Sequence, residues 1–426
     1  MAEVLVLGGG GREVAIGQAM EASPEVTRVE IASDVNDGLA RFKGGDKPFV
    51  VVGPEAPLIA GVTDHLRIEG HSVFGPTKQM AEYERRKSHA IRMMREAKIP
   101  HPPTFIADTD NAALEFVKFH DAKDYVIKAD LPFGGKGVVI TDSNEQALSI
   151  TLDMRTGGGY GGAGTDIINY QRRHQGPEVS DIVIVGANDQ IFRLPMTQDH
   201  KRLLACDKGP NTGGMGAYGP VPESIVNNYQ FSKIEELAEK SLWGMRKAGV
   251  PYEQAALYSG LMLAEQLEGD PEVIEYNVRF GDPETQVQFP LAVKAGVDMY
   301  RLLRSAAERD LEVPRIDFHA LGLSALTVCL AAKGYPDSPI KGDYIWGLDA
   351  ELPDGVSVQK AAVTADEATN GGRVAYVTAV AEDIDSAAEL AYGIIDLKGE
   401  GPDSGKIGWA GMQARNDIGW QARRVA

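Results

Sequence analysis

The N-terminal part of the chain alternates short apolar runs with amphipathic stretches. Four strands are predicted in this part, at residues 4–7, 26–32, 49–52 and 72–75. Between the first two, Val14, Ile16 and Met20 begin a helical pattern, and strands that alternate with helices are typical of a parallel sheet. Residues 78–97 predict a single long, charged helix, and three prolines between residues 100 and 103 then mark a boundary between structural units.

Glycine-rich turns separate the predicted elements in the middle of the chain. Strands are expected at residues 125–130, 138–141, 182–185, 190–194, 258–265 and 273–278, and helices at 144–155, 234–248 and 299–309. The strand at 258–265 should pair with the strand at 273–278. The stretch 209–218 predicts a long irregular loop, which is uncommon inside a compact domain unless it is functional. On its approach, Asp199, Lys201 and Arg202 can orient a small charged substrate.

The C-terminal part predicts a smaller unit dominated by strands. Strands are expected at residues 325–331, 356–361 and 373–379, and a helix at 386–395. Because 426 residues are too many for one ordinary core, several structural units are expected. The expected fold class is therefore α/β and α+β multidomain, with an N-terminal parallel-sheet, Rossmann-like domain and a β-rich C-terminal domain.

The composition excludes several kinds of protein. A hydrophobic content of 43% and a charged content of 24% are those of a soluble globular protein. A net charge of −18 argues against an extended nucleic-acid surface, and no apolar run approaches the ~18 residues that a membrane span requires. Cys206 and Cys329 show neither metal-ligand nor redox spacing, and the first residues carry no basic secretory segment. We therefore expect a cytoplasmic protein without nucleic-acid or membrane partners.

A candidate metal site lies in the predicted strand at 273–278. Glu275 and Asn277 are two residues apart, so both side chains leave the same face of the strand. Carboxylate and amide oxygens are hard ligands that suit Mg²⁺, which also keeps waters and binds nucleotide phosphates. Arg279 repeats the two-residue step and adds a guanidinium for phosphate charge. The alternative is a strand whose polar face is only solvated.

Glycine-rich turns supply candidate phosphate contacts. The turn at 8–11 joins a strand to a helix N-terminus, which can bind an anion through backbone N–H groups and the helix dipole. The loop at 131–137 joins two strands and can fold over phosphates as a flap, with charge from Lys128 and Lys136. A purely structural hairpin is the alternative for this loop. Lys87, on the charged helix, is a further phosphate candidate.

Together these motifs resemble the phosphoribosylamine–glycine ligase family, whose members are ATP-grasp enzymes of purine biosynthesis. The matching segments follow the order of the family along almost the whole chain, at residues 9–13, 52–58, 74–76, 128–130, 134–137, 198–202, 209–218, 275–286, 333–336, 369–373 and 417–420. Each motif is weak alone. Seven or more in the same order are specific.

The resemblance implies an ATP-grasp core with a small lid, and ATP bound between the two. The implied domains are an N-terminal α/β substrate-binding domain (1–77), the core (78–110 and 181–318), the lid (111–180) and a C-terminal β-rich domain (319–426). The implied reaction joins glycine to 5-phosphoribosylamine through a glycyl phosphate, giving glycinamide ribonucleotide, ADP and phosphate, with ATP and Mg²⁺ or Mn²⁺ as cofactors. A monomer or weak homodimer is expected.

The resemblance also implies roles for individual residues. The residues implied to contact the nucleotide are Lys87, Lys128, Gly134, Gly135, Lys136 and Glu178. Those implied to hold the metal are Glu275 and Asn277, and those implied to act in catalysis are Arg279, Asp199 and Lys201. Those implied to bind the substrates are Gly10, Gly11, Arg12, Glu13, Pro54, Glu55 and Asp282.

Three segments depart from the family pattern. Val14 stands where the family has a histidine, and the connection after the second strand is shortened before Phe49. The hinge expected to hold the adenine, residues 171–174, reads Gln-Arg-Arg-His and offers no carboxylate. Weaker discrimination between ATP and GTP is therefore expected, unless another acid such as Asp166 or Glu178 folds into that place.

These departures leave alternatives open. One is an ATP-grasp ligase for a different carboxylate and amine, because a fold does not determine a substrate. Another is a catalytically weakened homologue that only binds nucleotide. An oxidoreductase is disfavoured, because the dinucleotide pattern Gly-x-Gly-x-x-Gly would have Glu13 or Val14 at its third glycine.

Overall fold

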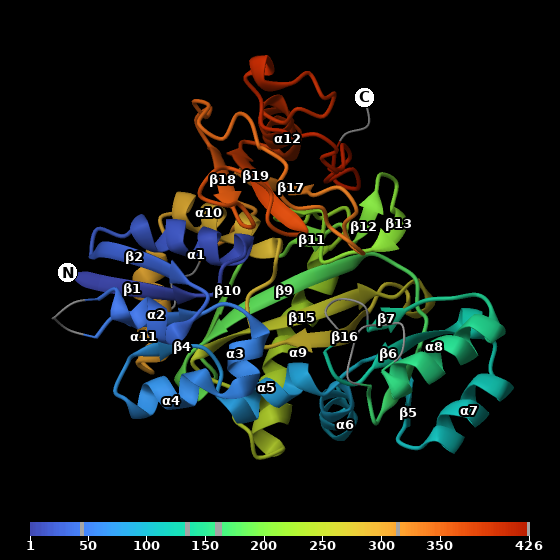
Figure 1. Ribbon diagram of the computed structural model, residues 1–426. Helices are drawn as coiled ribbons and strands as arrows, with labels where there is room; N and C mark the ends of the chain where they lie inside the picture. Colours follow the sequence, from blue (N-terminus) through green and yellow to red (C-terminus); the bar gives the residue numbers. More distant parts are fainter. Residues whose placement is uncertain (43–46, 133–136, 158–163, 312–315, 424–426) are drawn as a thin grey trace.

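The computed structural model describes residues 1–42, 47–132, 137–157, 164–311 and 316–423, whose arrangement is shown in Figure 1. These residues form four sheets of four or five strands and one two-stranded sheet. The central sheet crosses the middle of the molecule, with the N-terminal sheet on one side, a smaller sheet on the other and the C-terminal sheet above it (Figure 1).

The N-terminal sheet is parallel, which confirms the prediction from its alternating pattern. Its order is β2-β1-β3-β4, formed by β1 (Ala2–Leu7), β2 (Val26–Ala32), β3 (Phe49–Val52) and β4 (Val73–Phe74). The helices between them are α1 (Gly11–Glu21), α2 (Val35–Ala40), α3 (Glu55–Ala60) and α4 (Val62–Ile68). Because β1 and β3 are parallel neighbours, the turns that follow them lie at the same carboxyl edge of the sheet.

The segment 78–97 forms two helices, so the prediction of one long helix was wrong. The two helices are α5 (Lys78–Arg85) and α6 (Lys87–Ala97). They meet at Arg86, whose backbone is extended. Asp130 stabilises the break, because its carboxylate accepts a hydrogen bond from the Ser88 N–H at 2.6 Å and its carbonyl oxygen accepts one from the Lys87 N–H at 3.2 Å. A distant acid therefore caps α6 and places Lys87 at its first position.

The central sheet is antiparallel, with the order β10-β9-β15-β16. Its strands are β9 (Glu178–Val185), β10 (Ile191–Arg193), β15 (Ala255–Leu263) and β16 (Pro271–Asn277). The predicted pairing of β15 with β16 is confirmed, since Tyr258 lies opposite Asn277 and Gly260 lies opposite Glu275.

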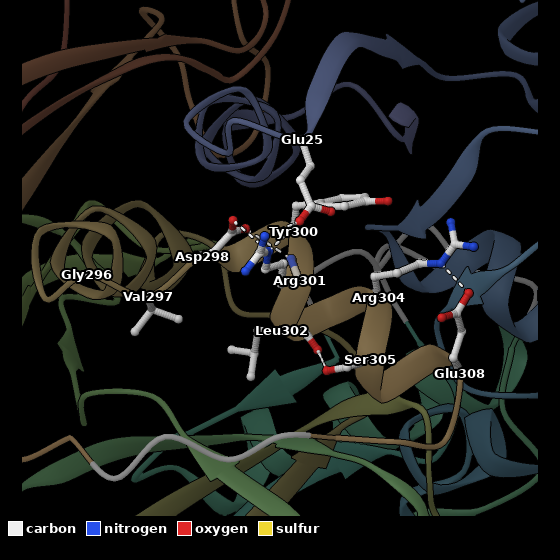
Figure 2. A pocket seen from close by; sticks show the side chains of 10 residues that line it. All are labelled: Glu25, Gly296, Val297, Asp298, Tyr300, Arg301, Leu302, Arg304, Ser305 and Glu308. Carbon is white, nitrogen blue, oxygen red and sulfur yellow. Dashed lines mark hydrogen bonds and ion pairs between the residues drawn. The ribbon is translucent and has the colours of Figure 1, made fainter. Parts of the chain in front are cut away.

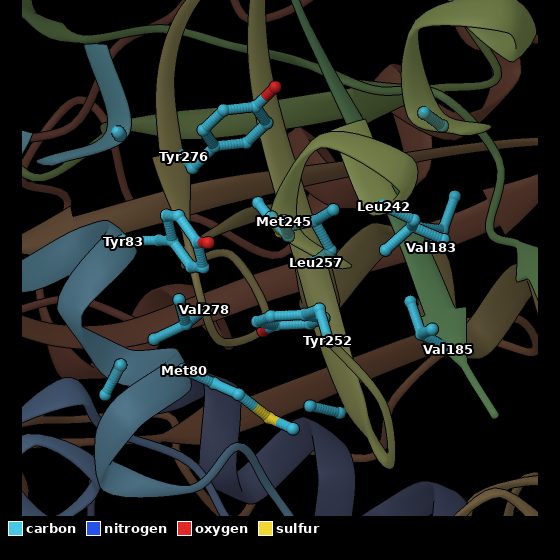
Figure 3. Close-up of a cluster of buried hydrophobic side chains, with 14 of the residues drawn as sticks. Met80, Tyr83, Val183, Val185, Leu242, Met245, Tyr252, Leu257, Tyr276 and Val278 are labelled. Atoms are coloured by element: carbon cyan, nitrogen blue, oxygen red, sulfur yellow. The ribbon is translucent and has the colours of Figure 1, made fainter. Parts of the chain in front are cut away.

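Helices α5, α6 and α9 (Asn228–Lys247) cover one face of the central sheet. In Figure 3, Met80 of α5 and Leu242 of α9 lie over Leu257, Tyr276 and Val278 from the sheet region. All five side chains are buried, and their apolar area is a main source of the stability of this layer. This packing directs the opposite side chains of β16 away from the core.

Helices α10 (Glu284–Lys294) and α11 (Met299–Ala307) join the central sheet to the N-terminal sheet. The apolar cluster that they share includes Val6 of β1, Ile184 of β9 and Leu302 of α11. This cluster covers the second face of the central sheet only in part. The rest of that face, toward β16, carries polar side chains.

A smaller four-stranded sheet lies beside α6, with the order β5-β8-β6-β7 (Figure 1). Its elements are β5 (Thr104–Ala107), α7 (Asp110–Phe119), β6 (Tyr125–Ala129), β7 (Val138–Val139), α8 (Asn144–Thr156) and β8 (Ile168–Arg172). The ring of Phe116 stacks on Tyr170 at 4.3 Å between centroids. Gly134, Gly135 and Lys136, expected in the flap between β6 and β7, lie outside the described residues.

The C-terminal strands complete a sheet that begins in the middle of the chain. Its order is β11-β14-β17-β19-β18, formed by β11 (Gln198–Asp199), β14 (Gly216–Gly219), β17 (Ser324–Ala331), β18 (Val356–Lys360) and β19 (Arg373–Ala381). Helix α12 (Ile384–Gly393) packs on β17 and β19. The prediction of an irregular loop at 209–218 was therefore wrong in part. Its ends belong to β14 and to β13 (Lys208–Asn211), which pairs with β12 (Arg202–Leu204).

Short 3-10 turns complete the description. They are η1 (Ala122–Asp124), η2 (Ala187–Asp189), η3 (Glu265–Leu267) and η4 (Pro402–Ser404). Among the residues that the structure describes, no helix is both long enough and apolar enough to cross a membrane.

Candidate functional site

The polar face of the central sheet holds the two predicted metal ligands. Ser180, Gly260 and Glu275 lie side by side on β9, β15 and β16. Glu275 and Asn277 point away from the apolar core, which contains Tyr276, so their predicted shared face is confirmed. Gly260 keeps the space beside them open, because a Cβ there would lie 3.0 Å from Cγ of Glu275.

Three lysines place positive charge around Glu275. Lys128 of β6 reaches across from the smaller sheet, and its Nζ donates to the Ile274 carbonyl oxygen at 3.2 Å. Burial lowers the pKa of Lys128 to about 8, and burial also lowers the pKa of Lys87. Burial acts to raise the pKa of Glu275, but the three ammonium groups, including that of Lys201, outweigh it and the pKa lies below its ordinary value. Glu275 is therefore ionised at neutral pH.

Arg279 connects this face to the N-terminal region. Strand β16 ends at Asn277, so Arg279 lies just beyond the strand, and its side chain lies beside that of Asn277. Its Nη2 lies 3.4 Å from Asn277 Oδ1 and 3.1 Å from Glu84 Oε1, and its Nε lies 3.6 Å from Glu55 Oε2. Burial opposes its charge, but Glu84 and Glu55 outweigh burial and raise the pKa of Arg279. Sequence reasoning missed Glu84, because nothing in a charged helix marks which acid turns inward.

The glycine turn after β1 is closed by its own acid. Glu13 Oε2 accepts a hydrogen bond from the Gly10 N–H at 2.7 Å, and Glu13 Oε1 accepts one from Arg12 Nε at 2.5 Å. Arg12 Nη1 also donates to the Phe280 carbonyl oxygen at 3.1 Å. The Gly10 N–H is thus engaged by Glu13 and is not among the free donors that the sequence predicts for an anion.

Arg373 brings the C-terminal sheet to the same site. Its Nη1 donates to the carbonyl oxygens of Gly213 at 2.6 Å and Asp282 at 2.8 Å, and its Nη2 donates to Asp282 Oδ2 at 2.9 Å. Gln286 Nε2 donates to Asp282 Oδ1 at 2.7 Å. Burial acts to raise the pKa of Asp282, but Arg373 and Arg12 outweigh it and lower the pKa. Arg373 lies in a matched segment, yet no role was predicted for it.

The predicted residues Glu178, Asp199 and Lys201 form a charged group beside Glu275. Lys201 Nζ lies 2.6 Å from Glu178 Oε2. Burial acts to lower the pKa of Lys201, but Glu178 and Asp199 outweigh it and raise the pKa. Burial raises the pKa of Asp199 to about 7. Asp199 can therefore exchange a proton near neutral pH.

The structure gathers the predicted site residues into two adjoining groups. The group on the central sheet consists of Lys87, Lys128, Glu178, Asp199, Lys201, Glu275, Asn277 and Arg279. The group at the N-terminal edge consists of Gly10, Gly11, Arg12, Glu13, Pro54, Glu55 and Asp282. Within the described ranges, no set of three or more His, Cys, Asp or Glu side chains could hold a metal ion. In this part of the chain, Glu275 and Asn277 offer one carboxylate and one amide oxygen on the same face.

A surface depression of 730 Å³ lies along α11 and contains none of these residues (Figure 2). Its charged side chains already neutralise one another. Arg301 Nε donates to Glu25 Oε1 at 2.6 Å, and Arg304 pairs with Glu308. We therefore place the functional site on the central sheet and not in this depression.

Comparisons with known proteins identify the class of the chain. Family models for the N domain, the ATP-grasp (A) domain and the C domain of phosphoribosylglycinamide synthetase match residues 2–84, 85–285 and 325–421. A crystal structure of biotin carboxylase from Campylobacter jejuni is similar in fold, with 12% identity and a TM-score of 0.67 over 98% of this chain and 93% of that chain. The fold and the charged face of the central sheet define an ATP-grasp protein.

More similar relatives narrow the assignment. The phosphoribosylamine–glycine ligase of Ralstonia nicotianae is 36% identical over 444 aligned residues, which cover 99% of this chain and 100% of that protein. The crystal structure of the corresponding ligase from Thermotoga maritima has 32% identity and a TM-score of 0.78 over 98% of this chain and 100% of that chain. A trifunctional purine biosynthetic protein of Gallus gallus is 35% identical over 98% of this chain and 42% of its own length. The chain belongs to the phosphoribosylamine–glycine ligase family.

Proposed function

We propose that this chain is an ATP-dependent ligase that joins glycine to 5-phosphoribosylamine and yields glycinamide ribonucleotide, ADP and phosphate in purine biosynthesis. Full-length similarity to proteins named phosphoribosylamine–glycine ligase supports this reaction. The observation that carries the proposal is the face around Glu275, where an ionised carboxylate, an amide and several cations share one surface. Phosphoryl transfer depends on such positioning and neutralisation of charge.

We propose Glu275 and Asn277 as ligands of Mg²⁺ or Mn²⁺. The donor set fits a hard cation, because the Glu275 carboxylate is ionised and the Asn277 amide lies on the same face. When bound, the ion would neutralise phosphate charge and polarise the transferring group. Two protein ligands suffice for Mg²⁺, which usually keeps several waters.

Lys87 and Lys128 are the proposed phosphate contacts of the nucleotide, and Glu178 is a further proposed contact. Lys87 stands at the first position of α6, and its ammonium group adds positive charge beside Glu275. Lys128 lies against the backbone of β16, three residues from Asn277. Gly134, Gly135 and Lys136 stay predicted contacts of the flap.

In the proposed reaction, the γ-phosphoryl group of ATP passes to the glycine carboxylate. The amine nitrogen of phosphoribosylamine then attacks the carbonyl carbon of glycyl phosphate, and phosphate leaves. Arg279, held by Glu84 and Glu55, stabilises the charge of the acyl phosphate. Asp199, with its pKa raised by burial to about 7, accepts the proton that the attacking nitrogen loses. Lys201 supplies charge beside Asp199.

The N-terminal edge is the proposed binding site for the phosphoribosylamine. The turns after β1 and β3 meet at this edge, and a Cβ on Gly10 would lie 3.8 Å from Asp282 Oδ2. Gly11, Arg12 and Glu13 therefore face the same region as Asp282. Pro54 and Glu55 begin α3 from the neighbouring strand. Asp282 can here accept a hydrogen bond from an amine or hydroxyl group.

Phosphate release tests the proposed function directly. ATP, Mg²⁺, glycine and freshly generated phosphoribosylamine are combined and each is omitted in turn, with mass detection of glycinamide ribonucleotide. We expect release and product only in the complete mixture. Activity with another carboxylic acid or amine in place of these two would indicate a different substrate pair. Nucleotide binding without any product would indicate a weakened homologue.

A further inference from the structure

An acid does reach the hinge between β8 and β9, and it comes from β16. His174, in this hinge, lies with its Nδ1 2.5 Å from Glu272 Oε2. The two side chains are only 7% and 5% exposed. Glu272 is 98 positions away in the sequence, which is why the hinge sequence alone shows no carboxylate. The acid that contacts the hinge histidine is Glu272, which the sequence did not suggest.

The His174–Glu272 pair lies at the end of β16 that is away from Arg279. Glu272 and Glu178 both lie opposite Met262, two rows along the sheet from the row that contains Glu275. The other end of β16 leads to Arg279 and the N-terminal turns. A nucleotide whose phosphates contact Lys128 and the Glu275 face therefore extends its base toward His174, about 10 Å along the strand.

The hydrogen bond to Glu272 determines which ring nitrogen of His174 is available to a ligand. A carboxylate is an acceptor, so Glu272 takes the hydrogen bond from Nδ1–H, and in the neutral ring Nε2 keeps its lone pair. Across the described part of the chain, no hydrogen bond reaches Nε2, and this atom is not among the buried polar atoms that lack a partner. Nε2 is therefore open to a ligand as an acceptor.

We propose that His174 Nε2 recognises the nucleotide base by accepting a hydrogen bond from the exocyclic amine of adenine. Glu272 is the positioning residue, because it holds the imidazole ring in place. Guanine presents a carbonyl oxygen at this place, which would oppose the lone pair of Nε2. The proposal rests on the ATP-dependent function above. The hinge sequence predicts weaker discrimination between ATP and GTP, because it contains no carboxylate. With the His174 imidazole as the acceptor in its place, we instead expect a preference for ATP.

The test measures nucleotide binding by the full chain with Mg²⁺ and no other substrate, so ligase turnover is not required. Calorimetry compares ATP, GTP and purine riboside triphosphate, which lacks the exocyclic group. We expect the native chain to prefer ATP over both by at least about tenfold, the effect of one buried hydrogen bond. His174→Leu should reduce the preference for ATP over purine riboside triphosphate to about onefold, because the acceptor is gone.

Two further variants separate base reading from a general structural effect. His174→Gln offers an amide N–H to Glu272 and an oxygen to the base, so it should keep more of the ATP preference than His174→Leu. Glu272→Gln can satisfy either tautomer of His174, so it should reduce the preference in part. Arg172→Leu is the matched control, since Arg172 is an exposed residue of the same hinge and should leave all ratios unchanged.

Comparing the affinities of two nucleotides for the same variant removes the effect of a general loss of folded protein, because such a loss lowers the binding of both nucleotides equally. Equal binding of ATP and purine riboside triphosphate by the native chain would overturn the assignment of His174. The same conclusion follows if His174→Leu keeps the native ratio within about twofold. If none of the three nucleotides bound, the ATP-dependent function itself would fail together with the proposal, whereas binding without base selection would overturn the proposal alone.

Discussion

Replacing Arg373 by methionine tests whether the C-terminal sheet shapes the substrate site. Methionine keeps most of the apolar stem but removes three hydrogen bonds, one to Gly213 and two to Asp282. Among its described side-chain hydrogen-bond partners, Asp282 would keep Gln286 and Tyr376 but lose the charged one. The loop that carries Asp282 would then be free to shift away from the N-terminal turn.

The size of the effect follows from these bonds. Two of them end on neutral carbonyl groups, at about 0.5 to 1.5 kcal/mol each, and one ends on a carboxylate, at about 1.5 to 3 kcal/mol. Water can replace part of the lost hydrogen bonding, because the Asp282 side chain is 14% exposed. A net loss of about 2 to 3 kcal/mol in transition-state binding corresponds to a roughly 30- to 150-fold fall in kcat/KM.

Steady-state kinetics should locate the loss on one substrate. We expect Arg373→Met to lower kcat/KM for phosphoribosylamine by this factor, while the KM for ATP changes less than about threefold. Arg423→Met is the control, because Arg423 forms a partly exposed pair with Asp385 in the same region, 3.3 Å apart. An equal loss for ATP and phosphoribosylamine, or a fall of less than twofold, would refute the proposed role of Asp282 in amine binding.

The other predictions concern the metal, the base and the phosphates. Glu275→Gln or Asn277→Ala should raise the Mg²⁺ concentration needed for half-maximal activity while leaving the circular dichroism spectrum unchanged, and an unshifted Mg²⁺ titration would contradict the ligand assignment. The kcat/KM for the amine should rise with pH through about 7, because burial raises the pKa of Asp199 and only the deprotonated carboxylate accepts a proton. Asp199→Asn should remove this step and lower the rate by about 10²- to 10⁴-fold, whereas a persisting pH step would assign the base elsewhere. Lys128→Met should weaken ATP and GTP equally in binding assays, since it removes a phosphate contact, and a change in their ratio would show that Lys128 contacts the base.

The local pattern of residues was sufficient to predict the strands of the N-terminal sheet and the common direction of Glu275 and Asn277. The bounds of β2 and β3 agree with the prediction. Strand β3 is buried and apolar throughout, as an interior parallel strand is, whereas β2 is a partly exposed edge strand that also carries polar residues. The common direction of Glu275 and Asn277 follows from strand alternation alone. These features depend on neighbours in the sequence, so one sequence contains the information that predicts them.

The features that the sequence did not predict depend on contacts between residues that are far apart in the chain. The break at Arg86 depends on Asp130, which lies more than forty residues further along the chain. The acid at the hinge is Glu272 from another sheet, and Arg373 reaches the site from the C-terminal region. No local pattern distinguishes these charged residues from solvated ones, because each gains its partner only after the sheets have assembled.

The order of strands in the C-terminal sheet has a consequence for the newly made chain. Strand β14 ends at Gly219, and its neighbour β17 begins only at Ser324. At about 5 to 20 residues per second, the ribosome therefore completes β17 at least roughly 5 seconds after β14. Until then β14 has an open edge, which can pair with another unfinished chain. Strand β11, which carries Asp199, pairs with β14 on its other side, so this part of the sheet is complete only after β17 has been translated.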